Sequence, residues 1–400
     1  MCSNAYKSPI TTYAEETEMT KDTTFQKLVL LIRTLFHAFI HGRANKKVTN
    51  PKKIVALYLA NTIGDMIFAT SVFRAIKEKY PHSHLTVVGS NKNATTLYGN
   101  PDIDVYIKTP QHGSELVEKL KEVHADFGFT IPTGSIDIAT MFLASIKSIA
   151  CFNYVGVKNA HTISYALLKN LCIQVPFYIG KYVSQEYLRI LEPIDIYSTH
   201  TSKYLYYDPE VAKVVKEKYL ARGIDLEKEK IAAMVPGSRA KIKQWPTERF
   251  VAIANYLRQE GFKIGVVGGP EDKTEIELFT HSLKSKDFIS ADTLQLDEMM
   301  YFISTCKLLI ANDSGSVYIA ESFNVPTLVV VGPTDEIEHP PHGPLHFVVA
   351  PKRDGAPALR GHIRGYDKKE ARSQIEEVTV EDVLGPLKKL LQNLRQLASK

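Results

Sequence analysis

The chain has 400 residues, of which 44% are hydrophobic and 23% charged, which is typical of a globular protein with two ordinary domains. The formal net charge of +5 is small for this length, so it argues against nucleic acid as a partner but permits an anionic substrate or a membrane surface. Four scattered cysteines match neither a zinc site nor a disulfide framework and indicate a reducing compartment.

The first 50 residues form an N-terminal extension ahead of the first strand pattern. Residues 1–22 are polar and aperiodic, which predicts disorder, and residues 25–43 have helical periodicity. The expected apolar face of this helix consists of Leu28, Ile32, Leu35, Phe36, Phe39 and Ile40. A basic cluster of Arg43, Lys46 and Lys47 follows. Two interpretations stay open: the helix lies on the inner face of the cytoplasmic membrane, or it packs on its own domain or a partner subunit.

The same helical stretch does not predict a membrane span. It is interrupted by Arg33 and His37 and falls short of the roughly 20 apolar residues that cross a bilayer. It also lies late in the chain, after an acidic run at 15–18, and no small-residue cleavage site follows it, which argues against a signal peptide. We therefore expect a cytoplasmic protein.

Residues 51–208 alternate between strand and helix patterns. The apolar run 53–60 predicts a buried parallel strand, and a helical pattern follows at 66–80. The next strand is expected at 85–88, and further alternation continues to Ile131. Strand, helix and strand in this spacing predict an open parallel sheet with helices on both faces.

Residues 209–400 repeat this alternation and predict a second α/β domain. Its strands are expected at 230–235, 262–267, 307–311 and 326–331. The fold class is therefore α/β, with two doubly wound domains facing a central cleft, where the carboxyl ends of the strands bind ligands. The last helix, at 380–397, is amphipathic, and packing back on the first domain is one arrangement open to it.

Three loops follow strands and precede helices, and each has polar residues suited to ligand binding. The first, 61–65, contains Asn61, Thr62, Gly64 and Asp65, where Asp65 is either a functional carboxylate or a helix cap. The third, 312–316, contains Asp313, Ser314 and Gly315, which suit an anion at a helix N-terminus or a simple cap.

The second loop, residues 236–246, combines Gly237, Ser238 and three cations that include Lys243. This composition favours a diphosphate cradle in which Lys243 neutralises a leaving phosphate. The alternative is an exposed basic loop that only anchors the next helix through Trp245 and Pro246.

Other polar residues give weaker indications of a site. Asp102 and Asp104 have the spacing of a metal-binding pair, but the flanking sequence predicts a loop that enters a strand, so no metal or other cofactor is expected. His339 and His342 flank two prolines and are interpreted as structural.

Taken together, the ordered motifs resemble bacterial heptosyltransferases, glycosyltransferase family 9. The motifs are residues 63–65 with the helix up to Pro81, residues 100–104, 236–238 with 243–246, 268–271, 313–315 and 331–334. The resemblance covers about residues 52 to 395 and implies a GT-B fold, with the nucleotide sugar bound mainly by the second domain. It implies inverting, metal-independent transfer of heptose or a related sugar, from an ADP-linked donor to a lipid A-core or similar glycolipid acceptor.

The resemblance also assigns roles to residues. Asp65 matches the proposed general base, with Asn61, Thr62 and Gly64 around it on the acceptor side. The donor is expected at Gly237, Ser238, Lys243, Glu271, Asp313, Ser314, Gly315 and Tyr318. An oxocarbenium-like displacement needs a base for the acceptor hydroxyl and cations for the departing diphosphate.

Position 318 departs from the family pattern, which usually has a histidine there. Tyr318 can donate a hydrogen bond but cannot carry a positive charge as histidine can, so the donor sugar or base is open to change. Two alternatives to a transferase therefore remain: a nucleotide-sugar epimerase of GT-B fold, and a non-catalytic protein that binds nucleotide sugars.

Overall fold

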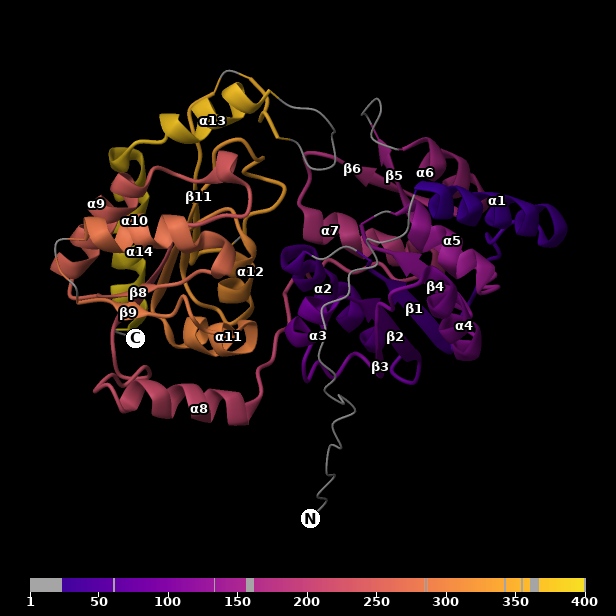
Figure 1. Ribbon diagram of the computed structural model, residues 1–400, viewed down its shortest axis with the longest axis horizontal. Coiled ribbons are helices and arrows are strands. Elements are labelled where there is room, and N and C mark those ends of the chain that lie inside the picture. Colours follow the sequence, from indigo (N-terminus) through magenta and orange to yellow (C-terminus); the bar gives the residue numbers. More distant parts are fainter. Residues whose placement is uncertain are drawn as a thin grey trace, which may run out of the picture.

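In the computed structural model, the chain forms two α/β lobes side by side (Figure 1). The residues described are 24–59, 62–132, 134–155, 162–283, 285, 287–341, 343–353, 355–359 and 367–398. The polar segment predicted at 1–22 lies outside the described residues, as do Asn61 and His342. None of the helices within these ranges is both long and apolar enough to span a bilayer.

A six-stranded parallel sheet in the order β3-β2-β1-β4-β5-β6 forms the first lobe. The strands are β1 (Lys53–Leu57), β2 (His84–Gly89), β3 (Val105–Lys108), β4 (Phe127–Thr130), β5 (Ile149–Val155) and β6 (Ile173–Tyr178). The two central strands, β1 and β4, are buried almost throughout, as expected for a sheet covered by helices on both faces. The strand order reverses between them, which places a crevice at their carboxyl ends.

The second lobe has the same strand order, read as β9-β8-β7-β10-β11-β12, and is also parallel. Its strands are β7 (Ile231–Val235), β8 (Lys263–Val266), β9 (Ile289–Ser290), β10 (Leu308–Asn312), β11 (Thr327–Val330) and β12 (His346–Val349). Its reversal lies between β7 and β10, so each lobe has one switch point. The predicted pair of doubly wound sheets is confirmed.

Helices cover both faces of the sheets (Figure 1). In the first lobe they are α1 (Thr24–His41), α2 (Ile63–Lys79), α3 (Asn91–Thr96), α4 (Gly113–Val123), α5 (Ser135–Leu143), α6 (Ile163–Leu168) and α7 (Val183–Leu188). The junction helix α8 (Pro209–Leu220) begins where it does because Asp208 caps it and Pro209 fits its first position.

The remaining helices belong to the second lobe. They are α9 (Thr247–Gln259), α10 (Lys273–Ser282), α11 (Leu296–Thr305), α12 (Gly315–Ser322), α13 (Lys368–Glu377) and α14 (Val380–Ala398). The last helix, α14, packs against α9, β11 and β12, so it stays on the second sheet instead of returning to the first domain. Its apolar side, with Val383, Leu387 and Leu390, fills the core of that sheet.

One hydrophobic core runs through both lobes. It includes Phe68 and Val72 of α2 together with Val317 and Ile319 of α12. The two helices pack directly against each other, so the switch points of the two sheets face one another across this contact.

Candidate active site

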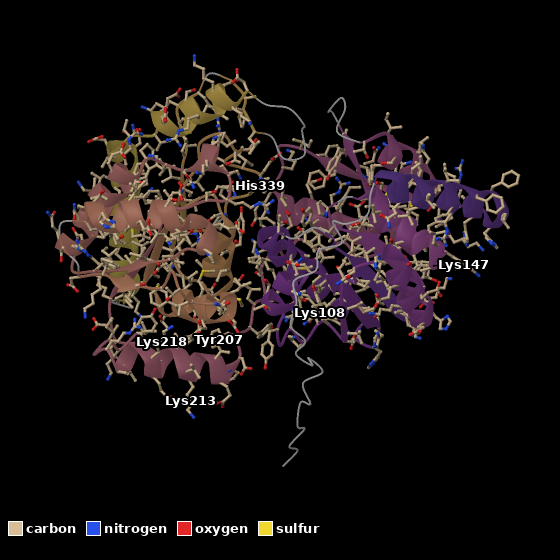
Figure 2. The ribbon with its side chains drawn as sticks, viewed as in Figure 1. Lys108, Lys147, Tyr207, Lys213, Lys218 and His339 are labelled. Atoms are coloured by element: carbon tan, nitrogen blue, oxygen red, sulfur yellow. The ribbon has the colours of Figure 1, made fainter. Side chains whose placement is uncertain are left out.

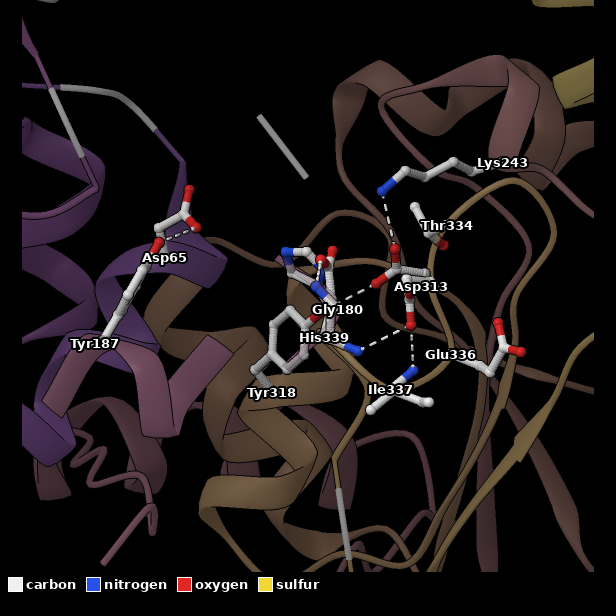
Figure 3. A network of polar contacts seen from close by, with 12 residues as sticks. Asp65, Gly180, Tyr187, Lys243, Asp313, Tyr318, Thr334, Glu336, Ile337 and His339 are labelled. Carbon is white, nitrogen blue, oxygen red and sulfur yellow. Dashed lines mark hydrogen bonds and ion pairs between the residues drawn. The ribbon is translucent and has the colours of Figure 1, made fainter. Parts of the chain in front are cut away.

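The loops predicted from the sequence lie at the two switch points. Residue 62 and α2 follow β1, whereas residues 236–246 follow β7 and residues 313–315 follow β10. Because β7 and β10 are neighbours, their loops meet at one edge of the second sheet. Figure 3 shows Asp65 on one side, with Lys243 and Asp313 on the other.

Asp65 lies in the first turn of α2 and is half-buried. Thr62 occupies the N-cap position, so Asp65 is not the capping residue. Its carboxylate instead accepts hydrogen bonds from three hydroxyls. These come from Tyr187 at 3.1 Å, Tyr58 at 3.1 Å and Thr62. The carboxylate is thus held in one orientation by neutral donors.

Both tyrosines keep their protons at ordinary pH. Burial and the neighbouring Asp65 charge raise the pKa of Tyr58 and that of Tyr187 well above the usual range. Each hydroxyl therefore stays a donor toward Asp65. Tyr187 comes from α7, which packs against α2 and brings a residue distant in sequence to the carboxylate.

On the second lobe, Asp313 is buried and paired with a cation. The ammonium group of Lys243 donates to Asp313 Oδ2 at 2.9 Å, and the hydroxyl of Tyr318 donates to Oδ1 at 3.0 Å. Burial alone would raise the pKa of Asp313, but the charges of Lys243 and His339 and these hydrogen bonds hold it below its usual range. Asp313 is therefore a fixed anion that positions Lys243.

The loop that carries Lys243 is held in place by Asn312, the last residue of β10. The Asn312 amide donates to the carbonyls of Pro236 at 2.8 Å and Gly237 at 3.2 Å, and its oxygen accepts from the Trp245 amide at 2.9 Å. The two ends of the loop are therefore tied to one fully buried side chain. At Gly237, a Cβ would overlap the carboxyl group of Asp272, which explains the glycine.

The two lobes touch at Tyr318. Its ring is buried against Phe68 of α2, with ring centroids 4.5 Å apart. A Cβ on Gly64 would lie 3.1 Å from the same ring, so a larger residue at that position would require the ring to shift. Tyr318 thus packs the interface between the lobes and orients Asp313, and its pKa is raised well above the ordinary value by burial and then by the Asp313 charge.

The other predicted site residues have varied surroundings. Ser314 occupies the N-cap position of α12 without a capping hydrogen bond from its side chain, and its hydroxyl contacts that of Ser316 at 2.8 Å. The backbone of Gly315 faces Ile63 at the start of α2. Ser238 is buried next to Gly237. Glu271, after β8, is exposed and pairs with Lys92 of α3 at 3.7 Å, so it lies at the rim between the lobes.

The aspartates at 102 and 104 form ion pairs within the first lobe. Asp102 is buried and accepts two hydrogen bonds from Arg74, at 3.0 and 2.8 Å. Asp104 pairs with Lys77 at 2.6 Å and accepts from the Leu85 amide at 2.7 Å. Both carboxylates are thus occupied by cations of α2. Within the described ranges, no three His, Cys, Asp or Glu side chains converge as a metal site.

Several residues near the site were not predicted. Tyr58 and Tyr187 come from outside the three loops: Tyr58 directly follows β1, whereas Tyr187 reaches the site through the packing of α7 against α2. His339 was interpreted as structural, but it lies near enough to Asp313 to lower the pKa of that carboxyl group. The buried Nδ1 of His339 has no hydrogen-bond partner among the described residues. Thr334, in the motif at 331–334, also has a buried hydroxyl without a hydrogen-bond partner among the described residues.

Two Rossmann-like domains whose switch points face one another define the GT-B class of glycosyltransferase. The sequence model of glycosyltransferase family 9 (heptosyltransferase) matches residues 114–362. Lipooligosaccharide heptosyltransferase 2 of Haemophilus ducreyi is 24% identical over 82% of this chain and 97% of its own length. The chain therefore belongs to glycosyltransferase family 9 and is an enzyme of that class.

Solved structures show the same fold. A family 9 glycosyltransferase from Veillonella parvula superposes with a TM-score of 0.70 at 20% identity, over 88% of this chain and 99% of that one. The E. coli ADP-heptose lps heptosyltransferase II gives a TM-score of 0.66 at 18% identity, over 85% of this chain and 99% of that one. The predicted GT-B architecture is thus confirmed.

Proposed function

We propose that this enzyme transfers heptose, or a closely related sugar, from an ADP-linked donor to a lipopolysaccharide core or similar glycolipid acceptor. The observation that carries the proposal is the opposition of Asp65, held by neutral hydroxyls, to the Lys243–Asp313 pair. Family membership and the similarity to lipooligosaccharide and lipopolysaccharide heptosyltransferases support the sugar and the acceptor class. Of the three hypotheses raised by the sequence, the transferase is the one that the family match favours.

The chemistry follows from a base on one lobe and a cation on the other. The acceptor hydroxyl attacks the anomeric carbon of the donor, and Asp65 takes the proton of that hydroxyl as the new C–O bond forms. The bond from the anomeric carbon to the diphosphate breaks on the opposite face, so ADP leaves and the configuration inverts. An oxocarbenium-like state on this path requires stabilisation of the departing negative charge.

Lys243 and the start of α12 supply that stabilisation in the proposed mechanism, which uses no metal. A lysine ammonium has three N–H donors, and Asp313 is its one hydrogen-bond partner among the described residues. Two donors are therefore left for phosphate oxygens. The amides of the first turn of α12, after Ser314, face the same edge and favour an anion.

Calorimetric titration with ADP, UDP, GDP and CMP tests the donor class, in buffer that contains a chelator. We expect selective binding of ADP. A transfer assay with ADP-heptose and a heptose-deficient core acceptor then tests the reaction, and nuclear magnetic resonance of the product reports its anomeric configuration. Preference for another nucleotide, dependence on added metal or retention of configuration would each contradict the corresponding part of the proposal.

A further inference from the structure

The N-terminal helix α1 is apolar on two opposite faces. Its inner face packs against α5, with Thr34 fully buried and Leu30, Leu31 and Ala38 in contact with the core of the first lobe. A surface helix normally has polar residues on the opposite side. In α1, that side is also hydrophobic.

The outer face of α1 consists of six large apolar side chains at spacings of three and four residues. Their exposed fractions are 52% for Leu28, 57% for Ile32, 39% for Leu35, 65% for Phe36, 88% for Phe39 and 56% for Ile40. These are the residues predicted from the sequence to share one face. A contiguous exposed patch of this kind marks an interaction surface rather than ordinary scatter of apolar residues.

The outer face is fixed relative to the first sheet. After Gly42, whose φ of 81° turns the chain, the Ala44 amide donates to the Leu171 carbonyl at 2.8 Å. The Ala44 carbonyl accepts from the Ile149 amide at 2.9 Å, and Asn45 forms a β-bridge with Ser148. These bonds anchor the C-terminal end of α1, so the helix presents its outer face in a defined direction.

Exposed cations lie within α1 and directly after it. Residues 24–53 contain seven of the 49 Lys and Arg residues of the chain and none of the 44 Asp and Glu residues. Arg33, Arg43, Lys46 and Lys47 in this segment are exposed. Lys147, whose backbone contacts that of Lys46, adds another exposed cation on the same side of the molecule (Figure 2). An apolar face edged by cations is complementary to anionic headgroups above acyl chains.

The helix α6 also exposes apolar side chains. This helix also packs against α5, and its Ile163 and Leu167 are 83% and 46% exposed. Figure 1 shows α1, α5 and α6 together at the outer side of the first lobe, away from the second lobe.

We propose that the outer face of α1, extended by Ile163 and Leu167, docks this enzyme on an anionic lipid bilayer. The inference rests on the proposed function in one respect: a glycolipid acceptor is held in such a bilayer. A second copy of the chain fits the surface less well, because a two-fold contact would bring both sets of cations together without any acidic partner from residues 24–53.

Co-sedimentation of the full chain with vesicles tests this docking. Vesicles of phosphatidylcholine mixed with phosphatidylglycerol should bind the protein, and the double variant Phe36→Gln/Phe39→Gln should lower the partition coefficient by roughly tenfold or more. A triple variant, Arg43→Gln/Lys46→Gln/Lys47→Gln, should bind about tenfold more weakly to the anionic vesicles and lose most of its salt dependence. Vesicles of phosphatidylcholine alone should bind the unmodified chain less.

The control variant Val214→Gln/Leu278→Gln removes two apolar side chains of α8 and α10 that are 56% and 55% exposed, and it should leave vesicle binding unchanged. Equal binding of the Phe36→Gln/Phe39→Gln variant and the unmodified chain would overturn the proposal. So would light scattering that shows a dimer which this variant converts to monomers. Transfer to a water-soluble core fragment should be the same for both proteins, so a failure of the proposed reaction appears in that assay and not in sedimentation.

Discussion

Two aspartates lie on opposite lobes near the switch points, and their surroundings differ in kind. Asp65 is half-buried and bound by hydroxyls of Tyr58, Thr62 and Tyr187, with no ion pair to a cation among the described residues. Asp313 is buried and bound by the ammonium of Lys243. The first arrangement orients a carboxylate without cancelling its charge, whereas the second cancels the charge and so positions the cation.

Asp65 and Asp313 are suited to two different uses of the same side chain. A general base must be able to take a proton, so neutral donors that fix its orientation suit it. A carboxylate that is held ionised by a neighbouring cation is a poor base but a good anchor for that cation. Asp65 is therefore expected to affect the rate and Asp313 the binding and stability.

The largest effect is expected from Asp65→Asn, which keeps the shape of the side chain but removes the base. Transfer should fall by roughly 10²–10⁴-fold. The affinity for ADP, measured by calorimetry, should change by no more than about twofold, because Asp65 belongs to the opposite lobe. A parallel loss of ADP affinity would mean that Asp65 shapes the site instead of reacting, and the contrast with Asp313 would fail.

Lys243→Ala should weaken ADP binding by about tenfold or more and lower the free energy of unfolding by about 3 kcal/mol, because Asp313 is left buried without its cation. Adding Asp313→Asn should restore most of the stability but not the ADP affinity. Lys241→Ala is a matched control, since it removes an exposed cation from the same short 3-10 turn. Unchanged ADP affinity in the Lys243→Ala variant would remove this residue from the donor site.

A third carboxylate, that of Asp137, also has a hydroxyl as its partner. Asp137, in the first turn of α5, is buried and accepts from the Thr130 hydroxyl at 2.7 Å, and burial raises its pKa to about 6. The folded protein thus binds this proton more tightly than the unfolded chain, so Asp137 lowers stability as pH rises from about 4 to about 6, with no further loss above.

Asp137→Asn should remove that dependence. Relative to the unmodified chain, the variant should gain on the order of 2 kcal/mol in free energy of unfolding between about pH 4 and pH 6 and then stay level. Urea denaturation at a series of pH values measures this difference. The same pH dependence in both proteins would show that the buried carboxylate does not behave as its surroundings indicate.

The smallest effect is expected from Tyr187→Phe, which removes one of three donors to Asp65. The turnover number should fall by roughly threefold to tenfold, as expected for one hydrogen bond, while ADP affinity stays the same. Tyr165→Phe is the matched control, because it removes another buried tyrosine hydroxyl, one that donates to the Phe152 carbonyl at 2.6 Å. An equal loss of turnover in both variants would assign Tyr187 a structural role only.

Much of this fold could be predicted from the sequence, because buried parallel strands appear as compact apolar runs. The strand at 53–60 was predicted three residues too long, since β1 ends at Leu57. The strand pattern did not identify β5 or β6. The edge strand β6 alternates between buried and partly exposed residues and contains Pro176, which a central strand would not tolerate.

Residues of the candidate site could be predicted where they lie in a loop that directly follows a strand. Lys243, Asp313 and Asp65 each follow a strand, and parallel strands bring such loops to one edge. Tyr187 could not be found in this way, because it reaches Asp65 only through the packing of α7 on α2. Asn312 lies in the loop at 312–316, but its hydrogen bonds are to the neighbouring loop after β7, which the sequence alone does not place beside it.

The hydrophobic core is continuous from α2 to α12. This continuity limits how the enzyme can evolve. Each lobe contains a complete Rossmann-like unit, and such units are often exchanged between genes. Here Phe68 and Gly64 of one lobe fit the ring of Tyr318 in the other, so a chimera with a lobe from a relative would place unmatched apolar surfaces against each other. Recombination should therefore preserve the pair, and new acceptor specificity should arise by substitution within the loops instead.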